Sequence, residues 1–472
     1  MSGSLLQKSN RRVYIQLALA GVIFIIITFG LSPDLSWSLR STAGITAAAI
    51  WLWVLEPIPM PLTAVMYVAG LPILGAASLE TALGGFASGS TFLIMAGFMM
   101  AQGVNSTLLG KRFANMTIVR FGGSVGGVLA GVLLAPQLLS IFIPATGVRT
   151  TLLLPAVMAV IQSMGLRRNT NTAKLLVLGL SFGTSISGVG LLPAAIANVL
   201  TVDLLKSSLG QHIYYFEWFK MTWPAWLLMI PLTWLIMLKI FPPEVKVLEI
   251  GEIEQELRGM GTLSKEEKKC LGILTLTVLL WMTESFHHLP TAVPALLAVV
   301  LMGLPGIGVA SWEKLKEIDW GTVLLMGATL SLASAINKSG AAELLAGKLL
   351  AFPGVEAGLS LPLLTVGILA LLTHVYHLGV SNVSTVVLTL TPVILQIALK
   401  LGINPLLAAV TINISAMLGF LLVVETLPGV ITYASGVYSP QDLMKVGFWL
   451  TLASIIVVIL TAMLWWPLIG LS

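Results

Sequence analysis

Long apolar runs separated by short polar segments dominate this sequence, and they leave few folds open to it. The first run extends from Val13 to Leu31, directly after Lys8, Arg11 and Arg12. A helix of about 20 apolar residues crosses a bilayer, so this run has the length of a membrane span. Hydrophobic residues make up 57% of the chain and charged residues 10%, whereas about a quarter of the residues of a soluble domain are charged. The sequence therefore predicts an all-α membrane protein with many spans.

The same composition argues against several other classes of protein. A single cysteine, Cys270, provides neither a disulfide framework nor a Cys-x-x-Cys metal motif. The net charge of +5 comes from cations scattered between the apolar runs, unlike the basic face of a nucleic-acid-binding protein. No small-residue cleavage site follows the first apolar run, so we interpret it as a membrane helix rather than a signal peptide. We expect no metal, no cofactor and no nucleic-acid partner.

One apolar block has the wrong length for simple spans. The block 121–166 is too long for one span and short for two spans with a polar turn, and Pro144 interrupts it. We interpret it as a re-entrant hairpin, which is tolerated where protein or an aqueous cavity covers the tip, and we predict a second hairpin at 358–400. Besides these hairpins, the sequence predicts about 11 transmembrane helices, at 13–31, 41–56, 61–79, 89–110, 174–202, 221–241, 269–286, 290–308, 319–337, 403–434 and 444–470.

The distribution of lysine and arginine supports this topology. With a cytoplasmic amino terminus, 18 of the 25 basic residues lie on the cytoplasmic side, six lie on the other side, and Arg149 lies in the membrane. Membrane proteins collect basic residues on the cytoplasmic side, and a single crossing by either hairpin would spoil this bias. We therefore predict a multi-pass protein of the inner cell membrane with its amino terminus in the cytoplasm.

Short motifs recur along the chain at a slowly growing distance. The segment from Pro155 to Gly165 matches the segment from Pro392 to Gly402, displaced by 237 positions. We therefore predict an inverted-topology repeat, with a first unit at 1–241, a cytoplasmic linker at 242–268 and a second unit at 269–472. Such repeats are typical of alternating-access transporters, in which broken helices meet at a substrate site near the midplane. A second match, at a displacement of 228, pairs Trp53, Glu56, Thr63 and Ala64 with Trp281, Glu284, Thr291 and Ala292.

The predicted hairpin tips carry the clearest resemblance to a known family. The repeat places Pro144, Ala145 and Thr146 opposite Ser381, Asn382 and Val383. With the stretches from Trp53 to Ala64 and from Trp281 to Ala292, these tips resemble the divalent anion transporter family, which carries Ser-Asn-Thr in each tip. The family includes sodium-coupled dicarboxylate and citrate carriers and sodium-independent exchangers. The resemblance covers nearly the whole chain and implies a homodimer.

The same resemblance implies where the substrate binds. In the family, Asn and Thr side chains of the tips hold the substrate carboxylates, and neighbouring backbone carbonyls hold sodium. The second tip keeps Ser381 and Asn382, whereas the first keeps only Thr146 and has lost side-chain donors at positions 144 and 145. The predicted substrate-binding residues are Ala145, Thr146, Gly147, Arg149, Thr184, Ser185, His377, Ser381, Asn382, Val383, Thr426 and Pro428.

Polar and helix-breaking residues interrupt two of the predicted spans. The freed helix ends would point unpaired N–H groups and partial positive charge at an anion. Where the family has a turn similar to Thr-Pro-Pro-Asn, this chain has Leu192, Pro193 and Ala194, and its asparagine, Asn198, comes several residues later. The interrupting residues are Gly183, Thr184, Ser185, Ser187 and Gly188 in one span, and Glu425, Thr426, Pro428 and Gly429 in its counterpart.

Arg149 lies three residues beyond the first tip in an otherwise apolar block. A charge there costs a few kcal/mol unless it is paired or faces water, and a guanidinium suits a carboxylate with two hydrogen bonds. Our hypothesis is that Arg149 supplies what a bound cation supplies in the sodium-coupled relatives, which would make the protein an obligate exchanger. The alternative is that Arg149 snorkels or neutralises Glu425.

Glu425 and two histidines admit more than one role. Glu425 is a proton-linked acid, an acid that repels substrate, or the partner of Arg149. His374 and His377 lie three residues apart on the second hairpin with no third metal ligand nearby, so we expect hydrogen-bonded polar residues. His377 is also a candidate for a second cation-like donor near Ser381.

The sequence thus predicts a transporter and not an enzyme. None of its five histidines is set with a GxSxG elbow or in HExxH spacing, and two closed hairpins at the midplane favour occlusion over an open channel. By resemblance we expect sodium-independent exchange of C4 and C5 dicarboxylates such as malate, succinate and 2-oxoglutarate. A sodium-coupled dicarboxylate or citrate symporter is the alternative.

Overall fold

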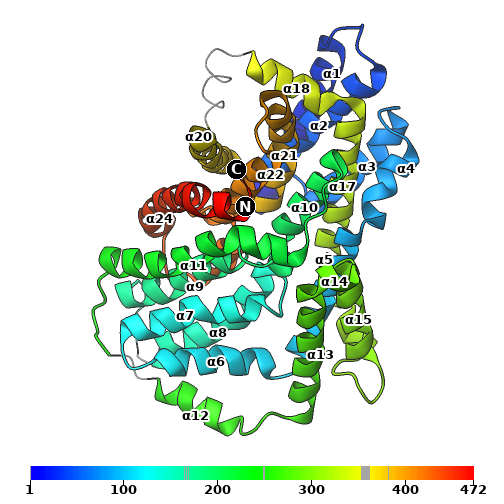
Figure 1. Cartoon of the computed structure of the whole chain (residues 1–472). Coiled ribbons are helices and arrows are strands. Elements are labelled where there is room, and N and C mark those ends of the chain that lie inside the picture. Colours follow the sequence, from blue (N-terminus) through cyan, green and yellow to red (C-terminus); the bar gives the residue numbers. More distant parts are fainter. Residues whose placement is uncertain are drawn as a thin grey trace.

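The computed structural model describes residues 2–163, 165, 167, 169–247, 250–351, 362–380 and 382–471. All regular elements in these ranges are helical (Figure 1). The helices up to residue 240 are α1 (Ser2–Gly30), α2 (Trp37–Leu55), α3 (Met60–Ile73), α4 (Leu79–Gly84), η1 (Gly85–Ala87), α5 (Gly89–Asn105), α6 (Leu109–Phe121), α7 (Val125–Ser140), α8 (Thr146–Ser163), α9 (Asn171–Ser187), η2 (Leu192–Ala194), α10 (Ile196–Leu209) and α11 (Tyr215–Ile240).

The described residues of the second part of the chain also form helices. Its helices are α12 (Gly251–Gly259), α13 (Lys265–Met282), α14 (Glu284–His287), α15 (Ala292–Gly303), α16 (Trp312–Leu315), α17 (Trp320–Ser339), α18 (Ala341–Leu350), α20 (Pro362–Gly379), α21 (Val383–Leu401), α22 (Pro405–Met417), η3 (Val423–Glu425), α23 (Leu427–Tyr433), α24 (Pro440–Leu460), η4 (Thr461–Trp465) and η5 (Trp466–Ile469).

Several of these helices have the length and hydropathy of membrane spans. Among the described residues, six helices could cross a membrane, and a seventh span results if the pair Leu79–Ala87 and Gly89–Asn105, bent by 41°, is counted as one. Five further apolar helices have 10–17 residues, α22 among them. The count of about eleven spans therefore stays a prediction, because interrupted helices are too short to be recognised as spans by length.

The predicted interruptions coincide with helix ends. The block 121–166 contains α7 and α8, which separate at 141–145 around Pro144, and the second block contains α20 and α21, which separate at 380–382. The first pair begins only at Val125, because α6 continues to Phe121 and the Ser124 side chain accepts a hydrogen bond from Gly127 N to start α7. The two broken spans appear as α9, η2 and α10, and as α22, η3 and α23.

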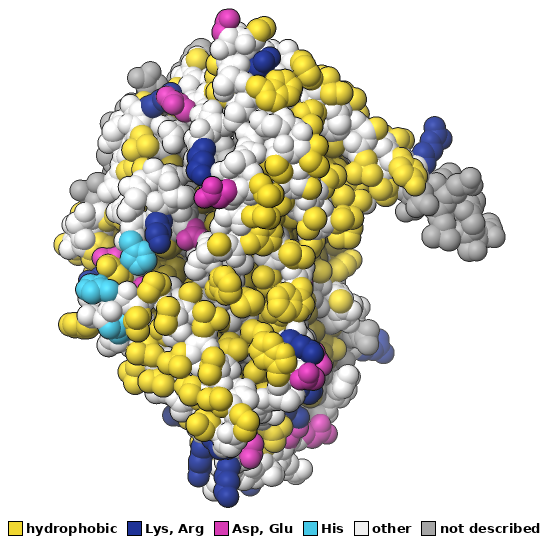
Figure 2. Space-filling model, turned by 90° about the vertical axis from the view of Figure 1, so that its right-hand side faces the viewer, with side chains coloured by type: hydrophobic (Ala, Val, Ile, Leu, Met, Phe, Trp, Pro, Cys, Tyr) yellow, Lys and Arg dark blue, Asp and Glu magenta, His cyan; other side chains and the backbone are white. Residues whose placement is uncertain are grey.

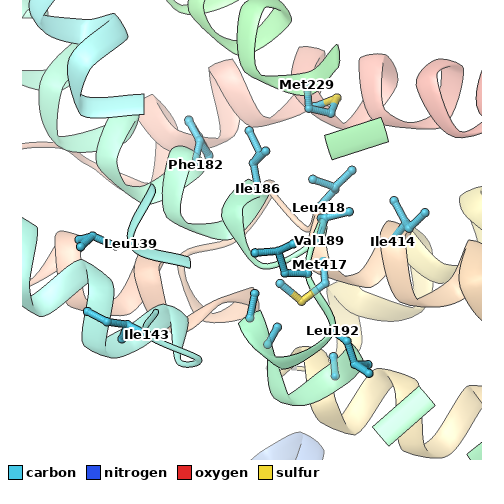
Figure 3. Close-up of a cluster of buried hydrophobic side chains, with 14 of the residues drawn as sticks. Leu139, Ile143, Phe182, Ile186, Val189, Leu192, Met229, Ile414, Met417 and Leu418 are labelled. Carbon is cyan, nitrogen blue, oxygen red and sulfur yellow. The ribbon is translucent and has the colours of Figure 1, made fainter. Parts of the chain in front are cut away.

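Apolar packing holds the two broken spans against each other. Figure 3 shows Ile186, in the last turn of α9, and Val189, just after that helix, close to Met417 and Leu418, where α22 ends. A Cβ at Gly188 would collide with the Met417 side chain, so glycine permits this close approach. Lipid tails are as apolar as these side chains, so helices in a membrane associate mainly through such close packing. The packing fixes the positions of both interrupted helix ends.

The outer surface fits a lipid environment. Figure 2 shows hydrophobic side chains spread over the middle of one face, with basic side chains gathered at its lower edge. Large apolar side chains such as Phe286, Ile73 and Leu468 are more than three-quarters exposed. A soluble monomer rarely exposes contiguous apolar areas of this kind, and the hydrocarbon core of a bilayer provides the matching solvent.

Ion pairs fasten the predicted linker to the first part of the chain. Helix α12 lies beside α6 at one end of the molecule (Figure 1), where Glu256 pairs with Lys111 and accepts from Asn115 at 2.9 Å. Arg112 donates to both carboxylate oxygens of Glu267, at 2.8 and 3.1 Å. The guanidinium also donates to the carbonyl oxygens of Met260 and Gly261. Arg112 therefore joins α6 both to the linker and to the start of α13.

Glu267→Gln is expected to destabilise the protein at pH 7 by about 2 kcal/mol, because Glu267 and Arg112 are only 3% and 13% exposed as side chains. The hydrogen bond from Arg112 lowers the pKa of Glu267. Its stabilising contribution is therefore complete above the unfolded-state pKa of about 4.3 and is lost as the pH falls through the lower folded-state pKa. Thermal unfolding of the purified proteins should give a lower unfolding temperature for Glu267→Gln than for the wild type at pH 7, and this difference should shrink in acid.

Glu266→Gln is the matched control, since Glu266 is exposed. It should unfold like the wild type at both pH values. An equal loss of stability in both variants, or a gap for Glu267→Gln that stays constant with pH, would contradict the assigned role of the ion pair.

Candidate functional site

A cavity of about 510 Å³ lies where the tips of both helix pairs meet both broken spans. One wall comes from the segment that leads into α8 and another from the segment that leads into α21. The rest comes mainly from α5, α9, α10, α17, η3 and α23, with Trp53 of α2 and Met417 of α22. Eight of the twelve predicted residues line this one cavity: Ala145, Thr146, Gly147, Ser185, Asn382, Val383, Thr426 and Pro428.

Four predicted residues do not line the cavity. Ser381 lies outside the described residues. Thr184 is fully buried and donates to the Leu180 carbonyl at 2.7 Å. It precedes Ser185 in α9, and the two side chains point about 100° apart around the helix axis, so Ser185 lines the cavity and Thr184 does not. Arg149 and His377 lie behind the cavity wall. Their placement there corrects the prediction that they reach into it.

Arg149 is 0% exposed and is held by backbone carbonyls rather than by acids. Its guanidinium donates to the carbonyl oxygens of Ile143, in the first tip, and of Ala194, the last residue of η2, the latter at 3.1 Å. None of the ion pairs within the described part of the chain includes Arg149. The alternative pairing of Arg149 with Glu425 is therefore also absent. The guanidinium instead ties the hairpin tip to the break in the neighbouring span.

His377 makes a similar contact in the other half of the molecule. It is 1% exposed, and its Nε2 lies 3.2 Å from the carbonyl oxygen of Glu425, the last residue of η3. Ala194 and Glu425 thus hold equivalent places, each at the end of the short 3₁₀ turn in a broken span. His374 bonds the Ser454 hydroxyl at 3.1 Å, as expected of a hydrogen-bonded polar residue.

Four helices begin on the cavity wall and point their amino-terminal ends at it. Thr146 begins α8, Ile196 begins α10, Val383 begins α21 and Leu427 begins α23, and all four residues line the cavity. The first backbone N–H groups of a helix have no partner within the helix, and the helix dipole places about half a positive charge there. The arrangement therefore favours an anion, as a convergence of helix amino termini does in general.

Polar side chains add hydrogen-bonding groups to this wall. Ser185 donates to the Thr426 hydroxyl at 3.4 Å, and that hydroxyl accepts from Gly429 N at 3.3 Å. Asn382 uses its Oδ1 to accept from Ser384 N at 2.8 Å, which leaves its amide N–H groups for a ligand. The wall can donate to a carboxylate through both side chains and helix ends.

The charged side chains on the cavity wall are both acidic. Within the described residues, Asp319 and Glu425 line the cavity, and no lysine, arginine or histidine does. Asp319 caps α17 through hydrogen bonds from Thr322 N and Oγ1, and the Glu425 carboxylate accepts from Leu421 N at 2.8 Å. The attraction for an anion must therefore come from helix ends, from the hydrogen-bond donors of the wall and from the buried guanidinium of Arg149 behind it.

Sequence reasoning missed the wall contributed by α5 and α17. Phe98, Gln102 and Asn105 of α5 line the cavity, as do Thr322 and Met326 of α17. These two helices also carry corresponding residues of the internal repeat, such as Met95 and Met326. The repeat was a usable signal for their involvement, although it does not indicate which side of each helix faces the cavity.

Asn198 braces the first break and does not line the cavity. It is fully buried, donates to the carbonyl oxygens of Gly188 and Leu191 at 2.7 and 2.9 Å, and accepts from Asn413 at 2.8 Å. Asn413 in turn accepts from Thr201 at 3.0 Å. This network satisfies carbonyls that the break frees and links α10 to α22.

Comparisons with known proteins place the chain among membrane transporters. The family described as "Sodium:sulfate symporter transmembrane region" matches residues 7–472. The "Sodium-dependent dicarboxylate transporter SdcS" of Staphylococcus aureus is 27% identical over 482 residues, which cover 96% of this chain and 91% of the relative. A "Membrane protein" of Cupriavidus necator is 23% identical and covers 96% of this chain and 92% of its own length.

Two solved structures share the fold. The YdaH transporter of Alcanivorax borkumensis superposes with a TM-score of 0.55 at 17% identity, covering 85% of this chain and 90% of its own. MtrF of Neisseria gonorrhoeae superposes with a TM-score of 0.54 at 12% identity, covering 94% of this chain and 97% of its own. At these identities the likeness concerns the fold alone.

Proposed function

The chain belongs to the sodium:sulfate symporter transmembrane family, and from this premise we propose that it exchanges C4 and C5 dicarboxylates across the membrane without sodium. The family and its named relatives are transporters, so the predictions of an all-α membrane protein and of a protein that is not an enzyme are confirmed. Membership also bears out the resemblance to divalent anion carriers. Its extension to the sodium-independent branch is our proposal.

The position of Arg149 is the main support for exchange. By family resemblance, backbone carbonyls beside the hairpin tips hold sodium. In this chain the carbonyl oxygens of Ile143 and Ala194 receive the Arg149 guanidinium instead. A cation that is covalently part of the chain cannot dissociate, so substrate binding would need no ion from solution. His377 makes the corresponding contact to Glu425 O in the second half.

The chemistry of the cavity supports a dicarboxylate as the substrate. Four helix amino termini converge on it, and Thr146, Asn382 and Thr426 supply side-chain donors from three different elements of its wall. Donors that come from both halves of the chain suit a ligand with a carboxylate at each end of a short carbon chain. We propose malate, succinate and 2-oxoglutarate as substrates.

The remaining features follow from alternating access. We propose that the two inverted repeats, 1–241 and 269–472, expose the cavity to each side in turn. The bias of lysine and arginine supports an inner-membrane protein with a cytoplasmic amino terminus, and family resemblance supports a homodimer.

Sodium-coupled symport is the second candidate, and the comparisons favour it over exchange. The Staphylococcus aureus relatives named as sodium-dependent dicarboxylate transporters match 96% of this chain. The buried guanidinium favours exchange instead. The two candidates share the substrate class and differ in what drives transport.

Uptake into proteoliposomes separates the candidates. We expect labelled 2-oxoglutarate or succinate to enter vesicles preloaded with malate and not empty vesicles, with equal rates in the presence and absence of sodium, because the carrier cannot cross empty. Uptake into empty vesicles driven by a sodium gradient would establish symport. The absence of uptake under all four conditions would reject the substrate class.

A further inference from the structure

Glu425 is an acid on the wall of a cavity that is proposed to hold an anion. Its residue is 1% exposed, and it lies beside Thr426 and Pro428 in the second broken span. With Asp319 at another wall, it contributes negative charge to a cavity whose described lining has no basic side chain. A dicarboxylate dianion would therefore meet an acid of its own charge.

Hydrogen bonds at the Glu425 carboxylate come from the backbone and not from a cation. Its Oε2 accepts from Leu421 N at 2.8 Å, and none of the ion pairs in the described ranges includes Glu425. A backbone amide can hold the oxygen of a neutral carboxyl group as well as that of a carboxylate. The site is thus compatible with both protonation states.

His377 is a basic group that lies close to this carboxylate. Its Nε2 contacts the Glu425 backbone carbonyl, while its buried Nδ1 has no partner. A Cβ at Gly419 would lie 2.5 Å from His377 Nδ1 and 3.2 Å from Glu425 Oε2. The unpartnered nitrogen and the carboxylate oxygen therefore flank the same small space, where a proton has an acceptor on either side.

Other titratable groups near the second break are occupied by partners of their own. Arg149 is held by two carbonyls, and His374 bonds Ser454. On the surrounding elements, Tyr438 bonds Gly429 O and Thr432, and Tyr433 packs beside the Tyr438 ring. Tyr376 bonds Thr389, Asp442 pairs with Lys174, Lys445 lies over the Phe241 ring, and Asp319 lies across the cavity.

We propose that Glu425 binds one proton together with each dicarboxylate and carries it across the membrane. A dianion beside an ionised carboxylate in a site of low dielectric is strongly disfavoured. On substrate entry, the Glu425 carboxylate takes a proton from water and becomes a neutral carboxyl group, which can donate a hydrogen bond to the substrate. On release, the proton returns to water on the other side, and no bond other than O–H is made or broken.

This inference rests on the proposed function and deepens it. It assigns a second transported species, a proton, to the same cavity. In an exchanger, each dicarboxylate would then travel with one proton in either direction. Because one proton then moves in each direction, exchange of one dicarboxylate for another carries no net proton, and a pH difference across the membrane would not drive it. The pH on each side would instead set how tightly the substrate binds there.

Calorimetry of succinate binding tests the proposal directly. The purified protein is titrated with succinate at pH 8 in two buffers with different ionisation enthalpies, which yields the number of protons taken up per succinate bound. We expect close to one proton for the wild type and none for Glu425→Gln, whose amide oxygen can still accept from Leu421 N. Between pH 7 and 9, where succinate is a dianion, the wild-type Kd should rise about tenfold per pH unit, whereas the Kd of Glu425→Gln should stay constant.

Asp319→Asn is the comparison variant, because Asp319 is the other acid on the wall. Proton uptake should persist in it. Uptake that disappears in Asp319→Asn and remains in Glu425→Gln would overturn the assignment to Glu425. Succinate binding by the wild type without proton uptake would overturn this inference and leave the proposed function intact. Absence of succinate binding altogether would reject the proposed substrate class and this inference with it.

Discussion

Replacing Arg149 with glutamine is expected to lower dicarboxylate counterflow at least about 100-fold. The substitution removes a buried positive charge and leaves the carbonyl oxygens of Ile143 and Ala194 without their donor. Each unpaired buried carbonyl costs about 1–3 kcal/mol, so the first hairpin tip should lose its tie to the break in the neighbouring span. Counterflow of labelled succinate in malate-loaded proteoliposomes measures the loss.

Two further variants make this result interpretable. Arg149→Lys keeps the charge and loses the planar fork that reaches two carbonyls, so partial activity is expected. Arg120→Gln, at an exposed arginine of α6, should transport like the wild type. Thermal unfolding of Arg149→Gln distinguishes loss of transport from loss of fold.

The hypothesis of a built-in cation also predicts how Arg149→Gln responds to sodium. If sodium restores transport to this variant, an added ion has taken over the role of the guanidinium. Transport that persists in the variant, with its sodium dependence unchanged from wild type, would show that Arg149 does not replace a coupling ion.

Gly447→Ala is expected to destabilise the protein by about 3 kcal/mol and to reduce transport more than tenfold. A Cβ at Gly447 in α24 would collide with the backbone carbonyl of Phe420 and approach the Cα of Leu421. These residues begin the second break, and Leu421 N holds the Glu425 carboxylate. Backbone atoms, and not a flexible side chain, would have to move to remove this clash, so we expect the substitution to cost substantial stability.

Gly272→Ala in α13 is the matched control for this substitution. A Cβ there has no neighbour within 4 Å, and alanine is favoured over glycine in a helix by up to about 1 kcal/mol. The control should therefore unfold at the same or a higher temperature in the same detergent, and transport normally. Similar behaviour of the two variants would contradict the close approach of α24 to the second break.

The sequence predicted the interruptions of the helices well because interruptions have local causes. Pro144 has no backbone N–H, and it lies in the segment where α7 and α8 separate. Gly188 and Glu425 lie within the predicted broken spans, where the structure has η2 and η3. Because the sequence located the tips and breaks, eight of the twelve residues predicted beside them lie around one cavity, and their role in substrate binding stays a prediction.

The sequence patterns that located the interruptions did not predict which individual side chains face the cavity. Thr184 and Ser185 are adjacent and chemically alike, yet only Ser185 faces the cavity. The rotation of α9 that decides between them is set by its packing on α7, α8, α11 and α23, including the close approach of Gly183 to Leu133. Hydropathy cannot report this rotation, because every side of α9 is buried.

Arg149 shows most clearly which features follow from the sequence and which depend on the tertiary structure. A charge in an apolar block must find a partner, and the sequence alone determined that requirement, together with an all-helical membrane fold and the positions of its interruptions. The tertiary structure decided that the partners are the carbonyls of Ile143 and Ala194 rather than Glu425 or a substrate. The physical reason is that these carbonyls are free only where two interrupted helices meet, and that meeting depends on contacts between residues far apart in the chain.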